Sequence, residues 1–249
     1  MKKQIKIAVI PAAGSGTRIS ELPLTRILPK PMLPLLNKPI AEHIIDWLKS
    51  IGIKKIYFIV SFKKEIFKDY FGDGEDFGVQ IKYINCPDRQ KIGGLADGLY
   101  LLKNIIKKPF IVVLGDDFTI TKSYEDLINT FFTKKSLVLE TVVKETNINA
   151  LRRACSVKLD KEARIIDIQE KPENPKWAIR GCGIYIFDPI IFSFIEKTPL
   201  DNGKKDITKT IQIMAQETKK VFGFPVEKNI NINTLDDLYA ATLTVLQRK

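Results

Sequence analysis

Short apolar runs rich in β-branched residues alternate with helical patterns along the first half of the chain. The runs predict buried strands at 5–10 and 109–117 and further strands at 54–60 and 79–84. The patterns between them predict helices at 39–52, 63–72 and 94–106. Strands that read as continuous apolar runs are typical of parallel sheets, because helical crossovers cover both faces of such a sheet. The alternation therefore favours an α/β fold in which helices flank a parallel sheet.

The second half of the chain has a different pattern. Its predicted strands follow one another closely, at 136–143, 154–160, 164–170, 183–188 and 221–226, and its predicted helices lie at 123–132, 189–196, 206–218 and 234–247. Closely spaced strands without crossover helices are expected to pair antiparallel. We expect a Rossmann-like, mixed but mostly parallel sheet with a small antiparallel extension. Because no repeat or linker interrupts the chain, we expect one domain over residues 1–249.

The composition excludes several classes of protein. The chain carries 40 Lys and Arg against 29 Asp and Glu, a formal net charge of +11, which attracts polyanions such as nucleotides. The lysines are dispersed and no run of five like charges occurs, so a nucleic-acid-binding tail is not indicated. Cys86, Cys155 and Cys182 lack the spacing of a disulfide framework or a zinc site. No segment resembles a membrane span or a signal peptide, which predicts a cytoplasmic protein without membrane contact.

A stiff cationic loop follows the first predicted strand, at residues 11–36. In an open α/β sheet, ligands bind outside the carboxyl ends of the strands, which is where this loop is expected to lie. Gly14 and Gly16 let backbone amides approach an anion, and Arg18 offers a guanidinium for phosphate oxygens. Prolines on both sides of Lys30 restrict the backbone that carries its ammonium group. Neither a dinucleotide-binding fingerprint nor a P-loop fits, because Gly16 opens no helix and no Gly-Lys-Ser/Thr follows.

The stretch AAGSGTR…PLT…LPKPMLPLLNKPI, in residues 12–40, resembles the signature of the sugar-phosphate nucleotidylyltransferases, also called nucleoside diphosphate sugar pyrophosphorylases. Glucose-1-phosphate thymidylyltransferases and uridylyltransferases are familiar members of this family. Later motifs come in the family's order, so the resemblance covers nearly the whole chain. It implies the fold of the nucleotide-diphospho-sugar transferases. It also implies a nucleotide-binding half at 1–120 and a half at 121–249 that binds the sugar phosphate and includes the C-terminal helix.

The resemblance implies roles for the residues of the first half. Arg18 and Lys30 would neutralise the triphosphate, and Asp116 would hold Mg²⁺ against the phosphates. Asn231 stands where many members have a second metal-binding aspartate, and we expect it at the same site. The nucleotide is expected to lie against Ala12, Ala13, Gly14, Ser15, Gly16, Thr17, Gln90 and Gly94.

The resemblance also implies a sugar-phosphate site in the second half. Glu170 would bind sugar hydroxyls, Lys171 would bind the sugar phosphate, and Gly183 would leave room for the sugar. Cys155 replaces a glycine that approaches the sugar in the family, and the segment from Arg18 to Pro23 is two residues longer than usual. Both departures leave the identity of the acceptor open.

The reaction implied by the resemblance is transfer of a nucleotidyl group from a nucleoside triphosphate to a sugar 1-phosphate by Mg²⁺-assisted in-line attack. No general base is required, because the attacking phosphate is already an anion. Two alternatives stay open: transfer to a non-sugar phosphorylated acceptor such as a phosphocholine-like molecule, and a non-catalytic nucleotide- or nucleic-acid-binding protein. For the enzyme we expect no nucleic-acid or membrane partner. Family members often form dimers or tetramers, which leaves room for a homo-oligomer.

Overall fold

The computed structural model describes residues 4–14, 23–86, 94–121 and 123–247. In this part of the chain, nine strands form the main sheet: β1 (Ile7–Pro11), β4 (Lys55–Val60), β5 (Gln80–Asn85), β6 (Phe110–Val113), β8 (Val138–Lys144), β9 (Cys155–Leu159), β10 (Ile165–Glu170), β11 (Ile179–Phe187) and β12 (Val221–Pro225). Their order is β10-β9-β11-β6-β1-β4-β5, and β8 pairs with both β11 and β12.

The direction of the strands divides the sheet. β6, β1, β4 and β5 run parallel, whereas β11 runs antiparallel to β6, β8 and β9, and β10 runs antiparallel to β9. β12 returns parallel to β8. Two small antiparallel ladders lie beside the sheet, one of β2 (Pro34–Leu35) with β3 (Lys38–Pro39) and one of β7 (Asp117–Ile120) with β13 (Lys228–Asn231). The predicted mixed α/β fold with an antiparallel extension is confirmed.

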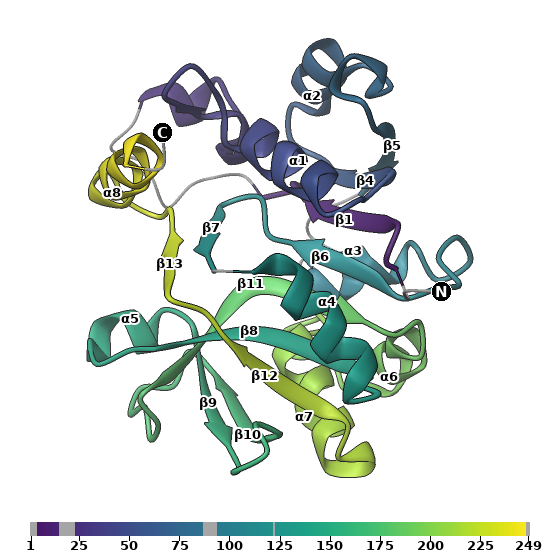
Figure 1. The fold of residues 1–249 in the computed structure, drawn as a ribbon, viewed down its shortest axis with the longest axis vertical. Coiled ribbons are helices and arrows are strands. Elements are labelled where there is room, and N and C mark those ends of the chain that lie inside the picture. Colours follow the sequence, from purple (N-terminus) through teal and green to yellow (C-terminus); the bar gives the residue numbers. More distant parts are fainter. Residues whose placement is uncertain (1–3, 15–22, 87–93, 122, 248–249) are drawn as a thin grey trace.

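Helices cover both faces of the sheet (Figure 1). One core cluster contains residues of α1 (Ile40–Ser50), α2 (Lys64–Phe71), α4 (Tyr124–Thr133) and α8 (Leu235–Leu246). The other contains residues of α3 (Leu95–Tyr100), α6 (Ile191–Lys197) and α7 (Ile207–Thr218). The strand β1 contributes side chains to both clusters, because successive residues of a strand point to opposite faces of the sheet. Ala8 and Ile10 belong to the first cluster and Val9 belongs to the second. The remaining short helices are η1 (Pro23–Arg26), η2 (Lys30–Met32), η3 (Glu75–Phe77) and α5 (Ile148–Arg152).

The long strand β11 joins the two parts of the sheet. Along one edge, its C-terminal portion pairs with β6 through Ile184–Phe187, and its N-terminal portion pairs with β9 through Arg180. The end of β6 and the beginning of β9 therefore meet beside residues 181–183. The opposite edge of β11 pairs with β8, and the register shifts between Gly181 and Tyr185.

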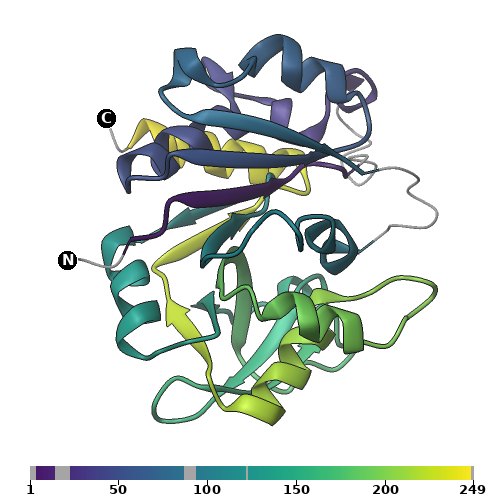
Figure 2. The ribbon, with the colours of Figure 1, turned by 90° about the vertical axis from the view of Figure 1, so that its right-hand side faces the viewer.

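The C-terminal segment returns to the N-terminal half. Figure 2 shows the yellow α8 among the purple and blue elements of that half. Ala241 belongs to the same core cluster as α1, and Leu238, Ala240 and Val245 pack against it. No helix in the described ranges is both long and apolar enough to cross a membrane.

Some predicted boundaries were wrong. The strand predicted at 109–117 is two strands, because Gly115 packs against Pro31 and the chain turns there, with Asp117 N–H donating to the Leu114 carbonyl at 3.1 Å. The helix predicted at 94–106 ends at Tyr100 and continues as turns, in which Leu102 and Ile106 remain buried. The strand predicted from residue 183 already begins at Ile179. The sequence patterns did not indicate β13 or α5.

We expect Phe58→Ala to lower the free energy of unfolding by about 3–5 kcal/mol, measured by urea denaturation. Phe58 has no solvent exposure and contacts the rings of Phe67, Phe71 and Tyr83, so its removal leaves a cavity in the core. Leu200→Ala is the matched control, because this side chain is 63% exposed, and it should cost less than about 0.5 kcal/mol. Equal losses in the two variants would contradict the packing described.

Candidate active site

Lys30 is a buried cation of the candidate site, held by two acceptors. It lies in η2, directly after Pro29, and is only 8% exposed. Its Nζ donates to Oδ2 of Asp116 at 2.7 Å and to Oδ1 of Asn233 at 3.0 Å. Because a buried charge is costly without a partner, these two acceptors are what permit an ammonium group at this depth. The structure therefore brings two residues of the predicted site, Lys30 and Asp116, into direct contact.

Asp116 lies in the turn between β6 and β7, beside β13. Its carbonyl accepts a hydrogen bond from the Ile232 N–H at 2.8 Å, and the next residue, Asp117, pairs with Asn231 in the β7–β13 ladder. The Asn231 side chain in turn accepts a hydrogen bond from the amide of Asn233. The predicted metal-site residues are thus held close together, Asp116 in the turn directly before β7 and Asn231 at the end of β13.

Asn233 is a site residue that the sequence reasoning missed as a partner of Lys30. Its backbone N–H donates to Oδ2 of Asp237 at 2.9 Å, and Asp237 also completes a capping box with Thr234 at the start of α8. The capping-box spacing was visible in the sequence, but nothing in it indicated that the preceding amide would face Lys30. The N-terminus of α8 therefore fixes one of the two acceptors of the Lys30 ammonium.

Asp117 has a structural environment. Its side chain is fully buried, which raises its pKa to about 6, although hydrogen bonds from Thr119 and Asn229 oppose this rise. Thr119 Oγ1 donates to it at 2.7 Å, and the Gly183 N–H donates at 3.1 Å. Arg180 holds Asn229 from the other side, with Nη1 donating to Oδ1 at 2.8 Å. This network ties β7, β11 and β13 together behind Asp116.

Gly183 is a glycine because of Asp117. A Cβ on Gly183 would lie 2.6 Å from the Asp117 side chain, and the Gly183 carbonyl accepts from the Leu114 N–H at 2.8 Å. The space over Gly183 is therefore occupied by the Asp117 side chain of the protein itself. The predicted contact of Gly183 with a sugar stays a prediction.

Glu170 is the last residue of β10, and Lys171 follows it directly. Glu170 pairs with Cys155 in the β9–β10 ladder, and Thr208 on α7 donates to Oε2 of Glu170 at 2.9 Å. Lys171 Nζ lies 3.2 Å from Oε1 of Glu170. The Lys171 backbone has a φ of +41° and its N–H donates to the Ala154 carbonyl at 2.8 Å, which fixes where this side chain leaves the strand.

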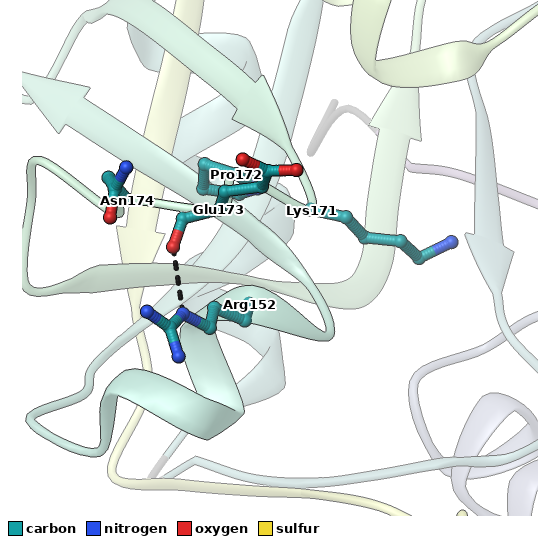
Figure 3. Close-up of a pocket in the computed structure, with 5 residues that line it drawn as sticks. All are labelled: Arg152, Lys171, Pro172, Glu173 and Asn174. Atoms are coloured by element: carbon teal, nitrogen blue, oxygen red, sulfur yellow. Dashed lines mark hydrogen bonds between the residues drawn. The ribbon is translucent and has the colours of Figure 1, made fainter.

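An open cavity of about 420 Å³ lies beside Lys171 and is lined by Arg152, Lys171, Pro172, Glu173 and Asn174 (Figure 3). Arg152 Nε donates to the carbonyl of Glu173 at 2.8 Å, which holds the loop after β10 against α5. In Figure 3 the Lys171 side chain extends away from Arg152. The cavity thus has the cationic side chains of Arg152 and Lys171 beside the acidic Glu173, and the Lys171 ammonium also pairs with Glu170.

Glu140 on β8 and Cys155 on β9 are buried next to Gly181 of β11. Glu140 is fully buried, and burial raises its pKa to about 8. The Cys155 thiol, also buried, donates to Oε1 of Glu140 at 3.5 Å, and burial raises the pKa of this thiol well above its usual range. A Cβ on Gly181 would overlap both side chains. The Cys155 side chain is therefore accommodated inside the protein, over the bare backbone of Gly181.

The predicted nucleotide-binding residues are only partly within the described residues. Ala12 continues β1 with its N–H donating to the Ile59 carbonyl at 2.8 Å, and Ala13 and the exposed Gly14 follow it. Gly94 precedes α3, and a Cβ there would lie 2.1 Å from the Lys205 carbonyl oxygen. The predictions for Ser15, Gly16, Thr17, Arg18 and Gln90 fall outside the described residues.

The donor set suits a hard divalent cation that keeps part of its water. Asp116 offers a carboxylate whose side chain is 30% exposed, and Asn231 offers an amide oxygen. In the described part of the chain, no group of three or more His, Cys, Asp or Glu side chains could hold a metal ion. Mg²⁺ is commonly bound by one or two carboxylates together with waters and substrate phosphates, so these residues fit Mg²⁺ rather than a metal that needs a complete protein cage.

Comparisons with known proteins agree with the resemblance. The family model described as nucleotidyl transferase matches residues 7–248. A bifunctional protein GlmU of Methanocaldococcus jannaschii is 36% identical over 85% of this chain and 47% of its own length. A UTP–glucose-1-phosphate uridylyltransferase of Synechocystis is 32% identical over 76% of this chain and 50% of its own length. The chain spans about half the length of these relatives.

The fold also matches a solved structure. A UDP-glucose pyrophosphorylase crystallised with UDP-glucose superposes with a TM-score of 0.84, covering 99% of this chain and 100% of that chain at 21% identity. At this identity the likeness shows a shared fold. The family-model match over residues 7–248 shows that this chain belongs to the nucleotidyl transferase family.

Proposed function

We propose that this protein transfers a nucleotidyl group from a nucleoside triphosphate to a sugar 1-phosphate, giving an NDP-sugar and pyrophosphate. The observation that carries the proposal is the position of Lys30, whose buried ammonium lies 2.7 Å from the Asp116 carboxylate beyond the end of β6. This edge, outside the carboxyl ends of parallel strands, is where α/β sheets bind nucleotides. Relatives named for uridylyl transfer to glucose 1-phosphate support the same reaction class.

Each half of the chain would bind one of the two substrates. In the proposal, residues 1–120 bind the nucleoside triphosphate, with the base near Gly94 and Gln90 and the phosphates near the loop from Ala12 to Arg18. Residues 121–249 bind the acceptor, with Lys171 on its phosphate and Glu170 on its hydroxyls. The junction along β11 supports this division, because it places the end of β6 and the beginning of β9 beside the same short segment, 181–183.

The chemical step needs charge neutralisation more than proton transfer. A phosphate oxygen of the acceptor forms a bond to the α-phosphorus of the triphosphate, while the bond from that phosphorus to the bridging oxygen breaks and pyrophosphate leaves. Both reactants are anions, so cations fixed before the reaction reduce the cost of bringing them together. Lys30 and Arg18 would neutralise the triphosphate and the leaving pyrophosphate, and Lys171 would orient the attacking phosphate.

Asp116 and Asn231 would hold Mg²⁺ in this proposal. When bound, the ion supplies a positive charge that polarises the phosphate oxygens. Asp117 and Arg180 stand behind these two residues and fix the spacing of β7 and β13. Lys30 would keep its position through Asn233 when a cation shares the Asp116 carboxylate.

A matrix of five nucleoside triphosphates against several sugar 1-phosphates and phosphocholine, with Mg²⁺ and a pyrophosphate readout, tests the function. We expect one pairing with a sugar 1-phosphate to release pyrophosphate at least about tenfold faster than the others, a difference of about 1.4 kcal/mol. Release with phosphocholine alone would favour the non-sugar acceptor. Nucleotide binding without pyrophosphate release from any pairing would contradict the proposal and favour a non-catalytic binding protein.

Lys30→Ala should lower turnover at saturating substrates by about 100-fold or more, because one preorganised charge contact in a reaction site has this scale. The measurement is kcat by pyrophosphate release, with circular dichroism to confirm folding. Lys49→Ala is the matched control, since this lysine is exposed and its carboxylate partner lies 4.0 Å away. Unchanged turnover in folded Lys30→Ala would exclude the role given to this residue.

Lys171→Ala should raise the KM of the acceptor by about tenfold, a loss of about 1.4 kcal/mol, and should change the KM of the nucleotide by less than about twofold. The reason is that its ammonium would contact the acceptor phosphate and not the triphosphate. Lys176→Ala, at an exposed position in the same loop, serves as the control. A change confined to the nucleotide KM would show that Lys171 serves the other substrate.

A further inference from the structure

Glu140 is an acid placed in the middle of the sheet. It pairs with Tyr185 of β11 on one side and Gly223 of β12 on the other, and its side chain has no solvent exposure. Val138 and Val142, the residues two positions away on the same face of β8, belong to the second core cluster. A carboxyl group therefore stands where the alternation of the strand would place another apolar side chain.

One oxygen of this carboxyl group lacks a partner. Cys155 Sγ donates to Oε1 at 3.5 Å, whereas Oε2 is buried without a hydrogen bond. Four titratable groups affect the pKa of Glu140 or have their own pKa affected by it: Cys155 on β9, Glu170 on β10, and Cys182 and Tyr185 on β11. None of these carries a positive charge. Burial, with a further contribution from Glu170, raises the pKa of Glu140 to about 8, so the group is neutral at pH 7.

The location of the proton follows from the hydrogen bond. Because Oε1 accepts from the Cys155 thiol, it acts as the carbonyl oxygen of the neutral acid. The proton then belongs on Oε2, the oxygen without a partner. Glu140 therefore presents an unused O–H donor. Leaving a buried donor unpaired is unfavourable, and an apolar side chain at the same place would avoid that cost.

The Glu140 carboxyl group packs next to the residues proposed for the acceptor. A Cβ on Gly181 would lie 2.3 Å from Oε1 of Glu140 and 2.2 Å from Sγ of Cys155, so both side chains occupy the space over this glycine. Cys155 pairs in turn with Glu170. The carboxyl group is thus one side chain away from the end of β10 and two residues along β11 from Gly183.

We infer that Glu140 is a specificity-determining residue, whose Oε2 hydroxyl donates a hydrogen bond to an oxygen of the bound acceptor. This inference rests on the proposed function. The acceptor it selects is a sugar 1-phosphate that carries a hydroxyl, or the carbonyl of an acylamino group, on the face turned toward Gly181. The inference requires the Cys155 side chain to rotate about its single χ1 bond and so open the space over Gly181 to the acceptor.

The test compares wild type with Glu140→Met, which removes the donor, and Glu140→Gln, which keeps a donor that cannot ionise. Thr141→Val is the matched control, because it removes a buried hydroxyl from the next residue of β8, where Thr141 bonds the Ile184 carbonyl. The substrates are the preferred nucleotide with glucose 1-phosphate and with each of its monodeoxy analogues. The readout is kcat/KM for the acceptor by pyrophosphate release, together with the KM of the nucleotide.

We expect wild type and Thr141→Val to lose at least about tenfold in kcat/KM with one monodeoxy analogue. Glu140→Met should lose a similar factor with glucose 1-phosphate itself and nothing further with that analogue, while the nucleotide KM changes by less than about twofold. If Glu140→Met keeps the wild-type preference among the analogues, the inference is wrong. If wild type releases no pyrophosphate with any acceptor, the proposed function fails and the inference fails with it.

If Glu140→Met does not fold, the pH dependence of kcat/KM for the acceptor tests the inference. In wild type, kcat/KM for glucose 1-phosphate should fall as the pH rises through the Glu140 pKa of about 8, because ionisation removes the donor. The pKa of Cys155 lies well above that range, so its thiol does not titrate there. Glu140→Gln should keep its activity at pH 7 and show no such fall. An identical pH profile in the two proteins would overturn the inference.

Discussion

The ion pair between Lys30 and Asp116 joins segments that are distant in sequence. Lys30 lies 86 positions from Asp116 and 203 positions from Asn233, yet its ammonium contacts both. Around this contact the chain is tightly constrained, since a Cβ on Gly115 would lie 2.6 Å from the Pro31 ring, and the Ile232 N–H is bonded to the Asp116 carbonyl. Removing the Asp116 carboxylate would leave the buried Lys30 ammonium with the neutral Asn233 as its remaining acceptor, so the ion pair favours one arrangement of these three segments.

The segment 181–183 of β11 is the second organising feature. Asp117 packs against Gly183, and Glu140 with Cys155 packs over Gly181. Both carboxyl groups are buried, and burial raises the pKa of each, to about 6 for Asp117 and about 8 for Glu140. Asp117 is surrounded by donors from Thr119, Asn229 and Gly183, whereas Glu140 has one weak donor and a free oxygen. This difference separates an acid that braces the fold from one that is left with capacity for a ligand.

Much of the fold could be predicted from local patterns, and much of the site could not. The apolar runs predicted β1 and β4 within a residue or two, because a strand buried on both faces must be apolar along its length. β5 was predicted as closely, although it is an edge strand with several exposed residues. β13 was missed, since its sequence KNIN has one apolar residue and gains its structure from pairing with β7. The Asn233 contact to Lys30 was missed for a similar reason: an amide side chain has no local preference that reveals a partner 203 positions away.

Sequence alone determined the alternation of strands and helices, the cationic loop, the acids Asp116 and Glu170, and the resemblance that the family match confirmed. These features are local, so residue type and spacing carry them. Only the tertiary structure decided that Lys30 faces Asp116, that Asp117 explains Gly183, and that Glu140 lies beneath Cys155 with an unpaired oxygen. Each depends on burial and on strands brought together by β11, and the cost of burying a polar group is fixed by neighbours that no local sequence pattern can name.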